Sequence, residues 1–195
     1  MLLAGLRSSR NARLISHCAQ PVKLELGSGR RKGRVDWLFS DWGGNGDFNF
    51  NFTKPIPLPG NSVDYLYSSH VLEHFSYPSP MLSFLGECLR ILKPGGVFSV
   101  AVPNARIFID AYLQPEKFDK EKYCSWDVGL SYTNGIDYLN FVAYLGGEHK
   151  HLFDDNNLVS VLEKAGFRGA RIREFDPDLD LQERKHESIY AVATK

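Results

Sequence analysis

The chain has 195 residues, with 23 basic and 23 acidic side chains, three cysteines and 43% hydrophobic residues. This length suits one domain with a substantial core, and the composition excludes a disordered, fibrous or disulfide-rich protein. No apolar run approaches the roughly 20 residues that cross a bilayer, so a transmembrane protein is excluded as well. The balanced charge argues against a nucleic-acid partner, and the few scattered cysteines fit a reducing, cytoplasmic location.

The charge is unevenly distributed along the chain. Residues 1–34 hold eight basic side chains and one acidic one, whereas the rest of the chain holds 15 basic and 22 acidic side chains. We expect residues 1–20 to form a basic helix of the mature protein that docks on its own acidic body. A basic rim that faces a substrate is the alternative, and the acid-free, Arg- and Ser-rich composition also resembles an organellar transit peptide.

From residue 21 onward, short apolar runs alternate with segments of helical periodicity. The helix at 81–92 has apolar side chains at i, i+3, i+4 and i+7, and Pro94 ends it. Asp154 is a plausible N-cap for a later helix that runs to Gly166. Alternating strands and helices predict an α/β protein with a mostly parallel sheet covered on both faces. The predicted strands are 22–26, 37–40, 48–52, 63–67, 97–102, 170–175 and 188–194.

Residues 104–150 interrupt this alternation with prolines, glycines and many aromatic side chains. Such a short segment buries little surface by itself, so we expect a lid inserted into a domain of residues 21–195. Its aromatic side chains, Trp126 and Tyr132 among them, would pack in the lid or stack on an acceptor.

The first predicted strand ends in Gly27-Ser28-Gly29. Ligands of parallel sheets bind beyond the carboxyl ends of the strands, and glycines let the backbone approach them closely. A plain tight turn is the alternative. A dinucleotide fingerprint requires a third glycine three residues further on and an acid about 20 residues later. Gly33 is one place late and Asp41 follows Gly29 by only 12 residues, so a dinucleotide site is disfavoured.

Taken together, these segments resemble class I S-adenosylmethionine-dependent methyltransferases, and most of all a small bacterial group with a short glycine loop. The resemblance rests on ELGSG after the first strand, the acid that ends the second, SSHVLEHF, and LKPGG before the fifth. It covers residues 21–104 and, less fully, 148–195. It implies a Rossmann-like, seven-stranded, mostly parallel sheet with helices on both faces and an antiparallel last strand.

The activity that the resemblance implies is methyl transfer from S-adenosylmethionine (SAM) to a small-molecule or glycan-precursor hydroxyl. No membrane or nucleic-acid partner is expected. Two alternatives remain open: a non-catalytic binding protein of the same fold, and a nicotinamide oxidoreductase, which the glycine spacing already disfavours.

The resemblance also implies which residues contact the cofactor. Asp41 would accept hydrogen bonds from the ribose hydroxyls, a role that suits a carboxylate, although it could instead cap the turn that follows it. Asn51 and Phe52 would lie at the adenine. The methionine end would be lined by Glu25, Gly27, Ser28 and Gly29, and the sulfonium by Ser69 and His70.

Residues 70–74 include three side chains that can accept protons or bind a metal ion. His70, Glu73 and His74 have i, i+3, i+4 spacing, which predicts one shared face of a helix. If the acceptor is a hydroxyl, a base with a near-neutral pKa assists the transfer, and His70 is the first candidate, with His149 second.

A similarity to small-RNA 2′-O-methyltransferases and ubiquinone-pathway O-methyltransferases implies a possible divalent cation. Glu73, His74 and His149 match the ligand positions, and mixed nitrogen and oxygen ligands suit a transition metal better than Mg²⁺. VLEH also occurs in metal-free relatives, so we expect no metal here. Glu73 and His74 would then hydrogen-bond the backbone and the lid.

Overall fold

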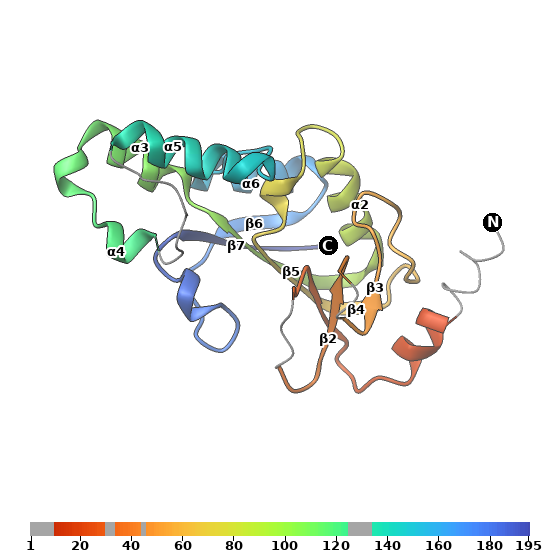
Figure 1. Ribbon diagram of the computed structural model, residues 1–195. Helices are drawn as coiled ribbons and strands as arrows, with labels where there is room; N and C mark the ends of the chain where they lie inside the picture. The colour runs from red at the N-terminus through yellow and green to blue at the C-terminus, as the bar shows by residue number, and fades with distance from the viewer. Residues whose placement is uncertain (1–9, 30–33, 44–45, 125–133) are drawn as a thin grey trace.

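The computed structural model describes residues 10–29, 34–43, 46–124 and 134–195 (Figure 1). Its centre is a seven-stranded sheet in the order β3-β2-β1-β4-β5-β7-β6. The pairs among β1 to β5 are parallel, and β7 runs antiparallel between β5 and β6. The prediction of a mostly parallel sheet with an antiparallel last strand is confirmed. The strands are β1 (Lys23–Leu26), β2 (Trp37–Asp41), β3 (Phe48–Asn49), β4 (Val63–Ser69), β5 (Leu92–Pro103), β6 (Arg168–Ile172) and β7 (Ser188–Thr194).

Helices α2 and α6 pack against the sheet, and α3, α4 and α5 lie between β5 and α6 in the sequence. Figure 1 shows α3 and α5 at the opposite end of the molecule from the helical residues 10–16. The α-helices are α2 (Met81–Ile91), α3 (Ala105–Leu113), α4 (Lys120–Tyr123), α5 (Gly135–Tyr144) and α6 (Asp155–Lys164); the 3₁₀-helices are η1 (Leu72–His74), η2 (Pro115–Lys117), η3 (Leu145–Gly147) and η4 (Gln182–Arg184).

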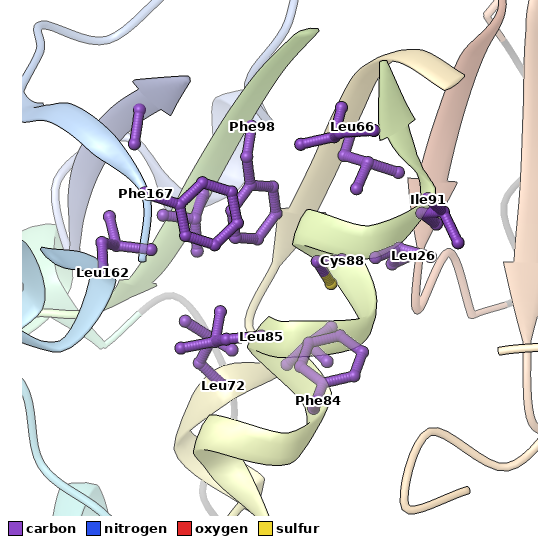
Figure 2. Packing of buried hydrophobic residues seen from close by; sticks show 14 of the residues in the cluster. Leu26, Leu66, Leu72, Phe84, Leu85, Cys88, Ile91, Phe98, Leu162 and Phe167 are labelled. Atoms are coloured by element: carbon purple, nitrogen blue, oxygen red, sulfur yellow. The ribbon is translucent and has the colours of Figure 1, made fainter. Parts of the chain in front are cut away.

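The hydrophobic core lies between the sheet and the apolar face of α2 (Figure 2). Leu85 and Cys88 of α2 are fully buried, as the helical spacing of their stretch predicts. Across the core, the rings of Phe98 in β5 and Phe167 before β6 lie 5.4 Å apart. Asp154 caps α6 by accepting a hydrogen bond from the backbone N–H of Asn157, as predicted.

Three predicted strands differ clearly from the observed ones. The strand predicted at 97–102 begins five residues earlier, at Leu92, so Pro94 lies within β5. The strand predicted at 48–52 is reduced to β3, although Phe48 and Phe50 are both buried as their alternation predicts. The pairing of this strand with β2 stops because Oδ1 of Asn51 accepts a hydrogen bond from the backbone N–H of Thr53, which folds the chain into a turn. The strand predicted at 170–175 lies at Arg168–Ile172 instead.

The N-terminal helix is described from residue 10 onward, and residues 1–9 lie outside the described part of the chain. Its contacts with the body include Ile15, which is buried in the core, and Asn11, whose side-chain amide donates to the carbonyl of Pro57 at 3.1 Å. Within the described ranges, no helix has the length and apolar character needed to cross a membrane.

Glu87 on α2 connects this helix to the proline-rich loop before β4. Its Oε2 atom accepts a hydrogen bond from the backbone N–H of Ile56 at 2.7 Å, and its Oε1 atom accepts one from Nε of Arg90 at 2.8 Å. The guanidinium of Arg90 in turn donates to the carbonyls of Ile56 and Leu58. Hydrogen bonds from Arg90 hold the pKa of Glu87 below its ordinary value.

Replacing Glu87 by glutamine should therefore lower the free energy of unfolding at pH 7 by about 1–2 kcal/mol. A carboxyl with a depressed folded-state pKa stabilises the fold above its unfolded-state pKa of roughly 4.3, and this stabilisation disappears as the pH falls. Urea unfolding at pH 7 and pH 3 should show a difference between the two proteins only at pH 7. Glu163→Gln, an exposed change on α6, should show none.

Candidate active site

Several of the predicted site residues lie at one edge of the sheet. The register pairs Leu26, the last residue of β1, with Ser40 of β2 and with Ser68 of β4. The residues that follow these strands therefore lie together at the carboxyl edge of the sheet, where β1 is next to β4. This is the place where open α/β sheets bind ligands.

The two glycines of the first turn have different roles. Both have a positive φ, +74° at Gly27 and +62° at Gly29. A Cβ added at Gly27 would lie 2.4 Å from Cγ2 of Val71, so Gly27 is required for packing. No described atom lies within 4 Å of a Cβ added at Gly29, so Gly29 borders open space. The backbone N–H groups of Gly27 and Ser28 both donate to the carbonyl of Ser40.

Glu25 is buried and forms an ion pair that the sequence did not predict. Its Oε2 atom lies 3.6 Å from Nη1 of Arg34. The guanidinium of Arg34 also lies over the ring of Tyr67, 4.6 Å from its centroid, and 5.2 Å from the centroid of Trp37. The basic N-terminal segment was a sequence signal, but only the fold brings Arg34 to Glu25.

Asp41 and Asn51 both make turns beside the site. Asp41 ends β2 at the expected edge, and its Oδ2 atom accepts the N–H of Gly43 at 3.0 Å. Asp41 therefore caps the turn that follows it, which was the alternative role. It also lies at the sheet edge where the cofactor contact was predicted. The ring of Phe52 packs edge-on against Phe84, with centroids 5.6 Å apart.

His70 corrects one prediction. It does not share a helix with Glu73 and His74, because the helical turn there is only η1 and His70 precedes it with φ +56°. The backbone N–H of His70 donates to the carbonyl of Ala101, which holds this left-handed conformation at the end of β4.

Two residues from the C-terminal part hold the end of β4. Ser188 had no predicted role, whereas the sequence suggested Arg184 as part of the wall of the acceptor site. Nε2 of His70 lies 2.8 Å from Oγ of Ser188, at the start of β7. Nη1 of Arg184 donates to both the carbonyl and Oγ of Ser69, at 3.0 Å each. No local pattern signals these contacts, since more than 100 residues separate the partners.

Glu73, His74 and His149 do come together. Oε1 of Glu73 lies 3.9 Å from Nε2 of His74 and 4.0 Å from Nε2 of His149. It also lies 3.8 Å from Nδ1 of His70. Glu73 is 1% exposed, and burial raises its pKa to about 8.

His149 reaches this cluster from the segment between β5 and α6. Its Nδ1 atom lies 2.7 Å from the carbonyl of Val142 in α5 and therefore donates to it, which leaves Nε2 unprotonated in the neutral ring. Burial lowers the pKa of His149. Lys150 and His151 donate their backbone N–H groups to the carbonyl of Glu73. Trp126 and Tyr132 lie outside the described residues.

Comparison with solved structures shows what the fold is similar to. The fold is that of class I SAM-dependent methyltransferases. A solved SAM-dependent methyltransferase from Archaeoglobus fulgidus aligns with a TM-score of 0.54 and 16% identity, over 98% of this chain and 94% of that one. A possible histamine N-methyltransferase from Thermotoga maritima aligns with a TM-score of 0.54 and 15% identity, over 97% and 88% of the two chains.

The sequence matches are more local. The methyltransferase-domain family model matches residues 44–100, so the chain carries a methyltransferase-domain pattern from the loop after β2 into β5. A probable SAM-dependent methyltransferase of Mycolicibacterium smegmatis is 43% identical over 53 residues. That match spans 27% of this chain and only 20% of the relative.

Proposed function

We propose that this protein transfers a methyl group from SAM to the hydroxyl of a small molecule or a glycan precursor. The observation that carries the proposal is the edge between β1 and β4, where Gly29 borders open space and Asp41 ends the neighbouring strand. The family match at residues 44–100 supports the same activity.

The chain's own residues fit the parts of this cofactor. Asp41 would accept hydrogen bonds from the ribose hydroxyls, and Phe52 with Asn51 would border the adenine. The turn at Glu25, Gly27, Ser28 and Gly29 would take the methionine end, and Ser69 and His70 would border the sulfonium. SAM supplies an electrophilic methyl group to such a site.

The protein's task in methyl transfer is to orient the acceptor and to exclude water. His70 lies at the end of β4, and its Nε2 atom lies 2.8 Å from Oγ of Ser188, which orients the ring. It would accept the proton of the acceptor hydroxyl, and His149 is the second candidate for this role. The helical segment from α3 to η3 would act as the lid that excludes water.

Calorimetry with SAM and with NADH distinguishes a methyltransferase-type site from a nicotinamide site. Asp41→Asn should weaken SAM binding by about 1–3 kcal/mol, because a charged acceptor of hydrogen bonds is lost while the turn can be kept. The matched control is Asp36→Asn, an exposed turn residue just before the same strand, which removes the same charge and should leave the affinity unchanged.

Equal affinity of Asp41→Asn and the unchanged protein would remove Asp41 from the cofactor site. Formation of S-adenosylhomocysteine with candidate acceptors separates the enzyme from a non-catalytic binding protein. SAM binding without turnover on any hydroxyl acceptor would favour the binding protein.

A further inference from the structure

Two backbone N–H groups of the glycine turn after β1 already have an acceptor inside the protein. The N–H groups of Gly27 and Ser28 both donate to the carbonyl of Ser40, at 2.8 and 3.1 Å. Backbone N–H groups in such turns are otherwise common binding sites for anionic groups of ligands. The methionine end of SAM carries an ammonium and a carboxylate, so its carboxylate needs a donor other than these two groups.

Arg34 places a donor beside the acidic side chain of β1. Its Nη1 atom lies 3.6 Å from Oε2 of Glu25, which is too long for a hydrogen bond. Nη1 is nevertheless buried, and no residue in the described ranges accepts a hydrogen bond from it. A buried guanidinium nitrogen without an acceptor is costly, and it points to an anionic group that a ligand would bring.

The guanidinium of Arg34 is held in place by contacts that do not use Nη1. It lies over the rings of Tyr67 and Trp37, 4.6 and 5.2 Å from their centroids. Its Nη2 atom donates to the carbonyl of Leu179, which belongs to the segment between β6 and β7. Arg34 therefore connects the end of β1 with a segment that lies about 145 residues further along the chain.

The segment that contains Leu179 also holds the acceptor side of the candidate site. Asp180 is buried and accepts a hydrogen bond from the hydroxyl of Tyr67 in β4, at 3.1 Å. Arg184 of the same segment donates to both the carbonyl and Oγ of Ser69, where β4 ends. The bond from Arg34 to Leu179 therefore links the cofactor side of the sheet edge to the segment that holds the end of β4.

We propose that Arg34 binds the carboxylate of the methionine end of SAM and thereby couples cofactor binding to the segment between β6 and β7. This inference rests on the proposed function. Glu25 would bind the ammonium, so the two charges of the amino-acid group each meet an opposite charge. A guanidinium suits this role because it has several donors in a fixed plane, so Nη1 can bind the carboxylate while Nη2 keeps its bond to Leu179.

The affinity test compares SAM with decarboxylated SAM, which keeps the ammonium and lacks the carboxylate. In calorimetry the unchanged protein should bind decarboxylated SAM roughly ten- to hundredfold more weakly than SAM, the range for a hydrogen bond between charged groups. Arg34→Gln should weaken SAM binding by a similar factor and should bind the two compounds within about threefold of each other. The matched control is Arg171→Gln, an exposed arginine of β6, which removes the same charge and should keep the full preference for SAM.

Hydrogen–deuterium exchange measures the coupling and needs no methyl acceptor. SAM should slow exchange in residues 174–187 of the unchanged protein, and decarboxylated SAM should slow it less. In Arg34→Gln neither compound should slow exchange there, because the link to Leu179 is lost. Circular dichroism checks that each variant folds, and the comparison of the two compounds on the unchanged protein decides the question if Arg34→Gln does not.

Three results would overturn the inference and leave the proposed function intact. They are equal affinity of the unchanged protein for SAM and decarboxylated SAM, a preference for SAM that folded Arg34→Gln retains, and exchange in residues 174–187 that SAM does not slow. Absence of SAM binding would overturn the proposed function and this inference together.

Discussion

Replacing His70 by asparagine should lower the turnover of methyl transfer roughly 10²–10⁴-fold, the contribution of a well-placed general base. Asparagine is the appropriate replacement because His70 has φ +56°, a conformation that asparagine tolerates and alanine does not. The variant should therefore keep its fold while losing the imidazole. Steady-state kinetics should show a fall in kcat with the KM for SAM changed by less than about twofold.

The pH profile provides an independent readout of the same change. The acid limb of kcat/KM in the unchanged protein should report the titration of an essential base, and His70→Asn should lose that limb. Ser188→Ala removes the hydroxyl beside Nε2 of His70 and should give a smaller loss, because the imidazole remains but is less well oriented. Turnover of His70→Asn within about threefold of the unchanged protein would exclude His70 as the base.

Replacing Phe84 by alanine should lower the free energy of unfolding by about 3–5 kcal/mol, the usual cost of deleting a buried ring. Phe84 is 1% exposed, stacks on Phe75 with centroids 4.7 Å apart and meets Phe52 edge-on. Because Phe52 is the proposed wall of the adenine site, SAM affinity should also fall in protein that remains folded. Urea unfolding and calorimetry measure the two effects separately.

Phe84→Leu is the matched control for this change. It keeps most of the apolar volume and should cost less than about 1.5 kcal/mol. Figure 2 shows Phe84 on the same helix as Leu85 and Cys88, whose burial the leucine variant leaves intact. A loss below about 1.5 kcal/mol for Phe84→Ala as well would contradict its role as a central core residue.

The sheet was predictable because most of its strands contain an apolar run that is bounded by glycine, proline or asparagine, whereas β6 (Arg168–Ile172) is polar and largely exposed. Val97–Val102 lies within β5, and the predicted 188–194 coincides with β7. Strand ends were less predictable, since hydrophobic alternation reports which face is buried and not how far the ladder extends. Phe50 illustrates this, because it is buried beyond the last residue of β3.

The site was predictable where it depends on local sequence and not where it depends on distant contacts. The positions of Gly27, Gly29 and Asp41 follow from strand ends. The spacing of His70, Glu73 and His74 suggested a helix. The hydrogen bond from the backbone N–H of His70 to the carbonyl of Ala101 instead imposes a turn, and no local pattern encodes it. The cluster with His149 still forms, because the chain returns to the carbonyl of Glu73 after 75 or more intervening residues.

That return sets a boundary for exchanging parts between related proteins. The peptide carbonyl of Glu73 is fixed by the backbone of Lys150 and His151, contacts that no choice of side chains can replace. A chimera that receives foreign helices in place of α3 to α5 should therefore be joined before Glu148. With a junction after His151, the hydrogen bonds to Glu73 would depend on the path by which the donor's own backbone returns to η1.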